Sequence, residues 1–164
     1  MDTPGLPPEL EPLAFLLGDW AGEGEGVYPT IEPFGYHEEI RFWHVGKPFL
    51  AYTQRTRHAE DGRPLHAETG YLRPVGADGV ELVLAHPTGV AEVAAGTVVG
   101  TRIDLATTTV ALTATAKEVT AVERTIDVDG DHRDLHPAHG RGGPADPAPP
   151  LRRPTPGVRP FPVR

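Results

Sequence analysis

A run of alternating glycines near the N-terminus is the feature that most restricts the fold. Residues 18–30 read GDWAGEGEGVYPT, with glycine at every second position from Gly22 to Gly26. Alternate side chains of a strand share one face, and glycine there often marks a bend or a close approach. The run predicts a bent strand with one bare face, typical of a barrel with room inside. The alternative is a flexible glycine-rich linker. Trp20 within the run, and Tyr28 followed by Pro29 at its end, argue against a linker.

The chain up to residue 130 otherwise reads as a series of short alternating strands. A short helix over Pro8–Leu17 comes first, with Gly18 at its C-terminal cap position. About nine strands at intervals near ten residues predict an all-β barrel or sandwich, and their alternation indicates an antiparallel sheet. After the glycine run, the expected strands are Glu38–His44, Phe49–Arg57, Leu65–Arg73, Glu81–His86, Val90–Ala95, Thr97–Leu105, Thr107–Thr115 and Glu118–Val128.

Composition excludes several classes of function. The chain has 164 residues, enough for one domain, and its lack of cysteine excludes disulfides, thiol catalysis and cysteine metal sites. Its net charge is −8, with −11 on residues 1–130 and +3 on residues 131–164, and an acidic body disfavours nucleic-acid binding. No signal peptide or membrane span is recognisable. We therefore expect a cytoplasmic protein that binds neither nucleic acid nor membranes.

The composition changes abruptly after Gly130. Residues 131–164 contain nine prolines, four glycines and six arginines but no isoleucine, tyrosine or tryptophan. Such a segment cannot bury enough apolar surface to offset its ordering entropy. We predict a barrel domain over residues 1–130 and a disordered tail over 131–164, with no last strand. The excess of alanine, glycine, proline and arginine is also what a GC-rich gene gives when it is read in a shifted frame. Resequencing around codon 131 tests this hypothesis, and an intact frame there would refute it.

Two histidines are the candidate binding residues. His86 shares its strand face with Leu82 and Leu84, whereas His66 shares a face with Glu68. A satisfied core histidine is the simpler interpretation of either one. Two histidines near neighbouring strand ends nevertheless predict a polar spot in an apolar cavity, which is the usual layout of a ligand site.

Other candidates carry less chemistry. His132, His136 and His139 have metal-like spacing, but the proline-rich tail offers them no scaffold, so we expect no metal site there. Lys117 could pair with an anion at the barrel mouth or simply be solvated. No nucleophile elbow, phosphate loop, HExxH motif or paired carboxylates are present, so no catalytic residue is assigned.

Five segments together resemble the nitrobindin family over about residues 10–130. They are GDWAGEGEGVYPTIEPFGY, HVGKPFLAYTQRTR, PLHAETGYLRP, ELVLAHPTGVAEV and TAKEVTAVERTIDVDG. The family's G-x-W-x-G-x-G-x-G run is complete at Gly18, Trp20, Gly22, Gly24 and Gly26. The length of the ordered series makes the resemblance more specific than any single motif.

The resemblance implies a fold and a function. Nitrobindins are antiparallel β-barrels of about ten strands, calycin-like and related in shape to fatty-acid-binding proteins. They bind ferric haem b at one mouth, often as homodimers, bind nitric oxide, and isomerise peroxynitrite to nitrate. By position, the resemblance implies a haem pocket that contains Thr30, Leu65, His66, His86 and Lys117.

The chain departs from the family at the iron ligand. The family's axial histidine follows the last strand in a context like PL-x-x-HL, and that position falls near Ala148 here. We therefore expect a nitrobindin-like barrel that lacks the iron ligand and no longer binds ferric haem in the usual way. One alternative is a working haem protein that isomerises peroxynitrite, with a residue such as His86 or His66 as the ligand. Another is a non-enzymatic carrier of a small apolar ligand.

Overall fold

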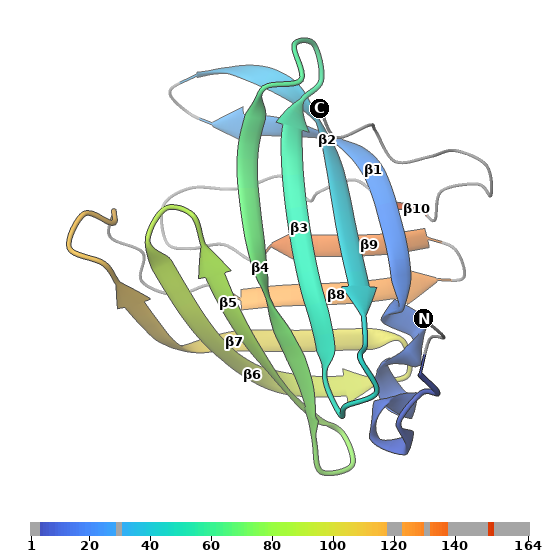
Figure 1. The fold of residues 1–164 in the computed structure, drawn as a ribbon. Coiled ribbons are helices and arrows are strands. Elements are labelled where there is room, and N and C mark those ends of the chain that lie inside the picture. The colour runs from blue at the N-terminus through green and yellow to red at the C-terminus, as the bar shows by residue number, and fades with distance from the viewer. Residues whose placement is uncertain (1–3, 29–30, 118–122, 130–131, 138–150, 153–164) are drawn as a thin grey trace.

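One short helix and ten strands make up the described part of the chain. The computed structural model describes residues 4–28, 31–117, 123–129, 132–137 and 151–152. No helix among them is long and apolar enough to cross a membrane. The elements shown in Figure 1 are the 3₁₀ helix η1 (Pro8–Leu16) and strands β1 (Gly18–Tyr28), β2 (Ile31–Trp43), β3 (Leu50–His58), β4 (Pro64–Val75), β5 (Gly79–His86), β6 (Val90–Val99), β7 (Arg102–Leu112), β8 (Glu123–Asp129), β9 (His132–Pro137) and β10 (Leu151–Arg152).

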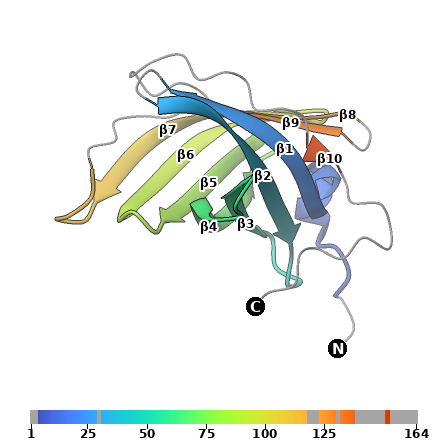
Figure 2. The same cartoon turned by 90° about the horizontal axis from the view of Figure 1, so that it is seen from above.

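The strands form one closed antiparallel barrel. Each strand from β1 to β9 pairs with its neighbour in the chain, and β10 lies between β9 and β1. Among the described residues, Ala21 of β1 pairs with Arg152 of β10, and this pair closes the barrel. Figure 2 shows the strands curving around a shared interior. The predicted all-β antiparallel barrel with a short N-terminal helix is confirmed.

The prediction that no strand follows Gly130 is wrong. β9 pairs with β8 over six residue pairs that start at Asp129 and His132, and β10 joins it to β1. The prolines of the tail begin only at Pro137, the last residue of β9. Backbone N–H and C=O groups can form the hydrogen bonds of a strand pair whatever the side chains are. The amino-acid composition of this segment was therefore not a reliable guide to its structure. Residues 138–150 and 153–164 of the predicted disordered tail lie outside the described residues.

The predicted boundaries between residues 90 and 115 are also wrong. Three strands were expected there, but the structure has two, β6 and β7, joined by a turn in which Gly100 has φ +60°. Gly96 lies inside β6, opposite Leu105. A Cβ at Gly96 would lie 1.8 Å from the carbonyl oxygen of Asp104. The glycine that looked like a strand end thus permits a close approach between two backbones.

The glycine run forms strand β1, as predicted, but its bare face is partly filled. Gly24 pairs with Tyr36 on β2, and a Cβ at Gly24 would lie 2.2 Å from the Tyr36 ring. The missing side chain therefore makes room for a tyrosine ring rather than leaving an empty interior. Trp20, in the same run, is buried and donates from Nε1 to the carbonyl of Leu16 at 2.8 Å.

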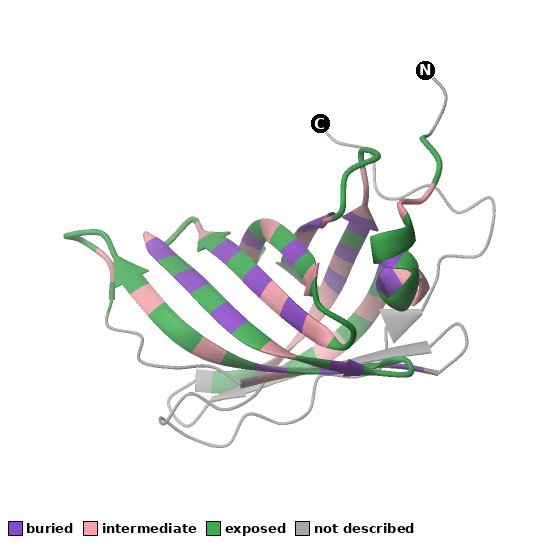
Figure 3. Cartoon of the chain, turned by 90° about the horizontal axis from the view of Figure 1, so that it is seen from below, coloured by how far each residue is buried: buried purple, intermediate pink, exposed green. Residues whose placement is uncertain are grey.

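The apolar core occupies the barrel end next to η1. Leu10, Leu13 and Leu16 of η1 are fully buried and belong to the core cluster. Strand residues alternate between buried and exposed, as Figure 3 shows along β4 to β6. The inner face of the sheet and the helix thus close one end, and the polar groups described below lie away from it. The inward core side chains contributed by the strands include Trp20, Ile40, Phe42, Leu50, Leu72, Leu82, Ile103 and Ile126.

Candidate functional site

Five charged or ionisable side chains from four strands converge inside the barrel. They are His66 and Glu68 on β4, His86 on β5, Glu92 on β6 and Arg124 on β8, and we call them the mouth cluster. Glu68 and Glu92 are each only 3 % exposed, whereas the His66 side chain is 43 % exposed. The cluster therefore runs from the barrel interior to solvent.

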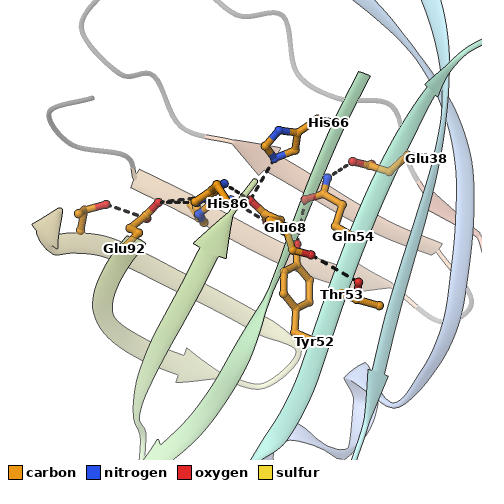
Figure 4. Close-up of polar contacts among 10 residues, drawn as sticks. Glu38, Tyr52, Thr53, Gln54, His66, Glu68, His86 and Glu92 are labelled. Atoms are coloured by element: carbon orange, nitrogen blue, oxygen red, sulfur yellow. Dashed lines mark hydrogen bonds and ion pairs between the residues drawn. The ribbon is translucent and has the colours of Figure 1, made fainter. Parts of the chain in front are cut away.

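Glu68 is the centre of the mouth cluster. Its Oε1 accepts a hydrogen bond from the Tyr52 hydroxyl at 2.6 Å and one from the Arg124 guanidinium at 3.3 Å. Its Oε2 lies 3.4 Å from His66 Nε2 and 3.5 Å from His86 Nδ1. Figure 4 shows the two imidazoles and the tyrosine around this carboxylate. Oε1 of this buried carboxylate thus accepts from two donors, whereas Oε2 faces two imidazole nitrogens whose roles depend on the tautomer of each ring.

Glu92 is held in a similar way on the neighbouring side. It accepts hydrogen bonds from the Thr107 hydroxyl at 2.9 Å and from Arg124 at 3.1 Å. His86 Nε2 lies 3.7 Å from the Glu92 carboxylate, and no hydrogen-bond partner for this nitrogen lies within range among the described residues. The His86 ring therefore stands between two carboxylates, one at each nitrogen (Figure 4).

The contacts keep both central carboxyls ionised. Burial by itself raises the pKa of Glu68, but His66, Arg124 and Tyr52 outweigh it and lower that pKa below its ordinary value. Burial also opposes ionisation of Glu92, yet the contacts with His86, Arg124 and Thr107 lower its pKa to about 2. The pKa of Arg124 is raised despite burial, because Glu68 and Glu92 face it. The cluster thus contains a charged triad of two carboxylates and one guanidinium.

A second polar group extends from Glu68 toward β2. The Tyr52 hydroxyl contacts Gln54 at 2.9 Å, and the Gln54 amide donates to Glu38. Burial raises the pKa of Glu38, and hydrogen bonding by Gln54 only partly offsets that effect. Burial and the nearby Glu68 charge raise the pKa of Tyr52 well above 10. The phenol therefore stays protonated and acts as a donor to Glu68.

Acid should weaken the fold through Glu92. Its pKa rises from about 2 in the folded chain to an ordinary 4.5 when unfolded, so its stabilising contribution is complete above pH 4.5 and lost as the pH falls toward 2. We expect a loss of about 2 kcal/mol in unfolding free energy across this window. Urea unfolding at several pH values should show a smaller loss in Glu92→Gln. Glu81→Gln, at an exposed pair with Arg73, should keep the wild-type pH profile, and an equal profile in Glu92→Gln would contradict the assignment.

The structure brings together two of the predicted pocket residues, whereas the others lie elsewhere or outside the described residues. His66 and His86 are brought together, with ring centroids 5.6 Å apart, and the His86 side chain is 10 % exposed, on the same inward face as the buried Leu82 and Leu84. Leu65 is half-buried where the register between β3 and β4 shifts. Lys117 is exposed in the loop after β7, and its role stays a prediction. Thr30 lies outside the described residues, as do the side chains of the three tail histidines.

Sequence reasoning missed the charged residues that organise the site. Glu92 stands between Val90 and Ala94 on an inward face, and Arg124 shares its face with Ile126. A charged residue within an apolar face was the available signal, since such residues are almost never buried unless paired. Their pairing could not be read from the sequence, because Arg124 contacts partners 56 and 32 residues away.

An apolar groove adjoins the cluster. It has a volume of about 310 Å³ and reaches His86 at the ends of β5, β6 and β7. Its other lining residues are Gly89, Val90, Ala91, Ala111, Leu112 and Thr113. The groove is open to solvent, since Ala91, Ala111, Leu112 and Thr113 are exposed, and its buried side is formed by Val90 and the His86 side chain.

Comparison with known proteins agrees with this geometry. Residues 9–142 match the family model described as "THAP4-like, heme-binding beta-barrel domain". The relative named Peroxynitrite isomerase 2 from Mycobacterium avium is 58 % identical over 130 residues, covering 77 % of this chain and 81 % of the relative. Peroxynitrite isomerase 1 from Mycobacterium tuberculosis H37Rv is 55 % identical over 136 residues, covering 79 % and 83 %.

A solved structure has the same fold. The crystal structure of Rv2717c from M. tuberculosis superposes with a TM-score of 0.78 at 49 % identity, covering 92 % of this chain and 100 % of that one. The sequence match spans most of the chain, and the fold match includes the barrel that surrounds the mouth cluster. This chain therefore belongs to the family of THAP4-like, haem-binding β-barrel domains, the nitrobindins.

Proposed function

We propose that this chain is a nitrobindin-type barrel that lacks the family's proximal iron ligand, so that haem binding and peroxynitrite isomerisation are strongly weakened. The observation that carries the proposal is the residue at the ligand position, which falls near Ala148, and alanine has no donor atom. The family match ends at residue 142, before that position. The homodimer and the ligand nitric oxide, which the resemblance implies, remain predictions.

The described histidines support this proposal. An axial ligand must direct a nitrogen lone pair at the iron. His66 and His86 are the described histidines of the mouth cluster, and each directs a ring nitrogen toward Glu68. The second nitrogen of His86 faces Glu92. These residues do not fit a haem held in the usual way by a proximal histidine, although the barrel that would surround the haem is present.

A haem titration tests the proposal. The full chain is titrated with ferric haem b while the Soret band is followed, and peroxynitrite decay is then measured. The M. avium relative, whose name is Peroxynitrite isomerase 2, serves as the positive control in the decay assay. We expect weak binding without a histidine-type spectrum, and decay close to the rate with free haem. Stoichiometric tight binding with a histidine-type spectrum would overturn the proposal, and its loss in His86→Ala would name the ligand.

The apolar groove favours a second candidate function, a carrier of a small apolar ligand. Its lining of valine, alanine and leucine side chains carries this candidate. A fluorescent fatty acid is a suitable probe, with displacement by an unlabelled fatty acid as the measurement. Saturable uptake that is weakened by Ala111→Glu would support the carrier, and uptake without saturation would exclude it. The exposed substitution Ala95→Glu, on the same sheet, is the matched control.

A further inference from the structure

We propose that His66, Glu68 and His86 form a binding site for a divalent transition-metal ion such as Zn²⁺ or Co²⁺. One ligand atom from each residue lies within 4.8 Å of the other two, and the printed contacts join His66 Nε2 and His86 Nδ1 to Glu68 Oε2. Two imidazoles and one carboxylate form a donor set that suits zinc and cobalt rather than the oxygen-seeking Mg²⁺ or Ca²⁺. The site goes beyond the haem chemistry of the family, since it uses no porphyrin.

The distances already approach those of a metal site. In a tetrahedral site with bonds near 2.1 Å, two ligand atoms lie about 3.4 Å apart. The distance from Glu68 Oε2 to His66 Nε2 is 3.4 Å, and to His86 Nδ1 it is 3.5 Å. The ring centroids of the two imidazoles lie 5.6 Å apart, and His66 is the ligand with room to move, because its side chain is 43 % exposed.

The surrounding residues orient two of the three ligands, Glu68 and His86, as in known metal sites. Glu68 uses Oε1 for Tyr52 and Arg124, so that Oε2 is left facing the two imidazoles. Metal-ligating histidines usually donate the other ring N–H to a carboxylate. His86 has that carboxylate in Glu92, which lies 3.7 Å from its Nε2 (Figure 4). This buried Nε2 has no closer partner among the described residues. If Nδ1 ligates the metal ion, Nε2 carries the proton and points it at the Glu92 carboxylate.

Charge and access also favour a cation. Glu68 and Glu92 bring two carboxylates, whereas Arg124 brings one guanidinium, which leaves a net negative charge that attracts a cation. Because His66 reaches solvent, an ion bound here would keep a coordination position open toward the barrel mouth. Three protein ligands and one open position are typical of zinc sites that bind water or an exchangeable ligand.

Cobalt provides the direct test. The haem-free full chain is treated with a chelator, dialysed and titrated with Co²⁺, and the visible d–d absorption of the bound ion is followed. We expect saturation at one ion per chain and a band intensity typical of four- or five-coordination. His66→Ala should weaken binding about 10-fold or more, and, as an exposed residue, it should leave the fold intact. Glu68→Gln tests the shared ligand, with circular dichroism as the check on folding.

Two controls make the test specific. His37→Ala removes a partly exposed histidine that also lies beside a carboxylate, 3.3 Å from Glu23, but outside the cluster, and should bind Co²⁺ like the wild type. A triple variant, His132→Ala, His136→Ala and His139→Ala, removes the tail histidines and should do the same. No saturable binding in the wild type, unchanged binding in His66→Ala, or loss of binding in the triple variant would each overturn the proposal. Because no haem is present, failure of the haem titration has no bearing on this result.

Discussion

Replacing Arg124 with methionine is expected to lower the free energy of unfolding by about 3–5 kcal/mol at neutral pH. The Arg124 side chain is 15 % exposed and contacts Glu68 at 3.3 Å and Glu92 at 3.1 Å. Both carboxylates are almost fully buried, so removal of the guanidinium leaves two charges without their main counterion. Urea unfolding of the chelator-treated chain at pH 7 is the measurement.

A surface arginine with similar partners serves as the control, because it shows how much stability is lost when an exposed ion pair, rather than a buried one, is removed. Arg102 also contacts two carboxylates, Asp104 at 2.8 Å and Asp127 at 3.7 Å, but its side chain is 52 % exposed. Arg102→Met should therefore cost less than about 1 kcal/mol. Adding Glu68→Gln to Arg124→Met should recover part of the loss, because one buried charge is then removed. Equal losses in the two arginine variants would contradict the assigned role of Arg124.

Gly70→Ala is the second substitution with a large expected effect. Gly70 lies on β4 opposite Leu84 of β5, and a Cβ there would lie 1.8 Å from the carbonyl oxygen of Val83. Relief of this overlap requires movement of strand backbone rather than of a flexible side chain. We expect a loss of about 2–3 kcal/mol in unfolding free energy, measured by thermal or urea unfolding.

The same substitution should also disturb the mouth cluster. Gly70 is two residues from Glu68, and its partner Leu84 is two residues from His86, so the close strand approach helps set the distance between these two side chains. Co²⁺ binding should therefore weaken in Gly70→Ala as well. Gly5→Ala, where no atom lies within 4 Å of the added Cβ, is the control and should change stability by no more than about 0.5 kcal/mol. If Gly70→Ala were as stable as Gly5→Ala, β4 and β5 would not approach each other so closely at Gly70.

The fold was predictable where local pattern determines it. Alternation of apolar and polar residues marks β3 to β5 because each strand buries one face. The short helix predicted from Pro8 is also present, as a 3₁₀ helix. The tail was misjudged because β9 is held by backbone hydrogen bonds to β8, which leave little trace in composition. The strand break expected between Ala95 and Thr97 was wrong because a glycine looks the same in the sequence whether it ends a strand or, like Gly96, admits a neighbouring backbone.

The site was predictable only in part, because its members are far apart in the chain. The inward direction of His86 followed from its strand face, and the presence of a second histidine nearby indicated a polar spot. Nothing in the sequence indicated that Glu92 and Arg124 would meet His86 and Glu68, since strand order and barrel curvature decide which inward residues face one another.

The sequence by itself determined the strand periodicity, the glycine run around Trp20 and the family, because each is written in neighbouring residues. Tertiary structure alone decided that the ring of Tyr36 fills the space above Gly24, that β9 and β10 complete the barrel, and that two carboxylates share one arginine. The physical reason is that these contacts depend on register and closure across the barrel, which bring together side chains that no local pattern connects.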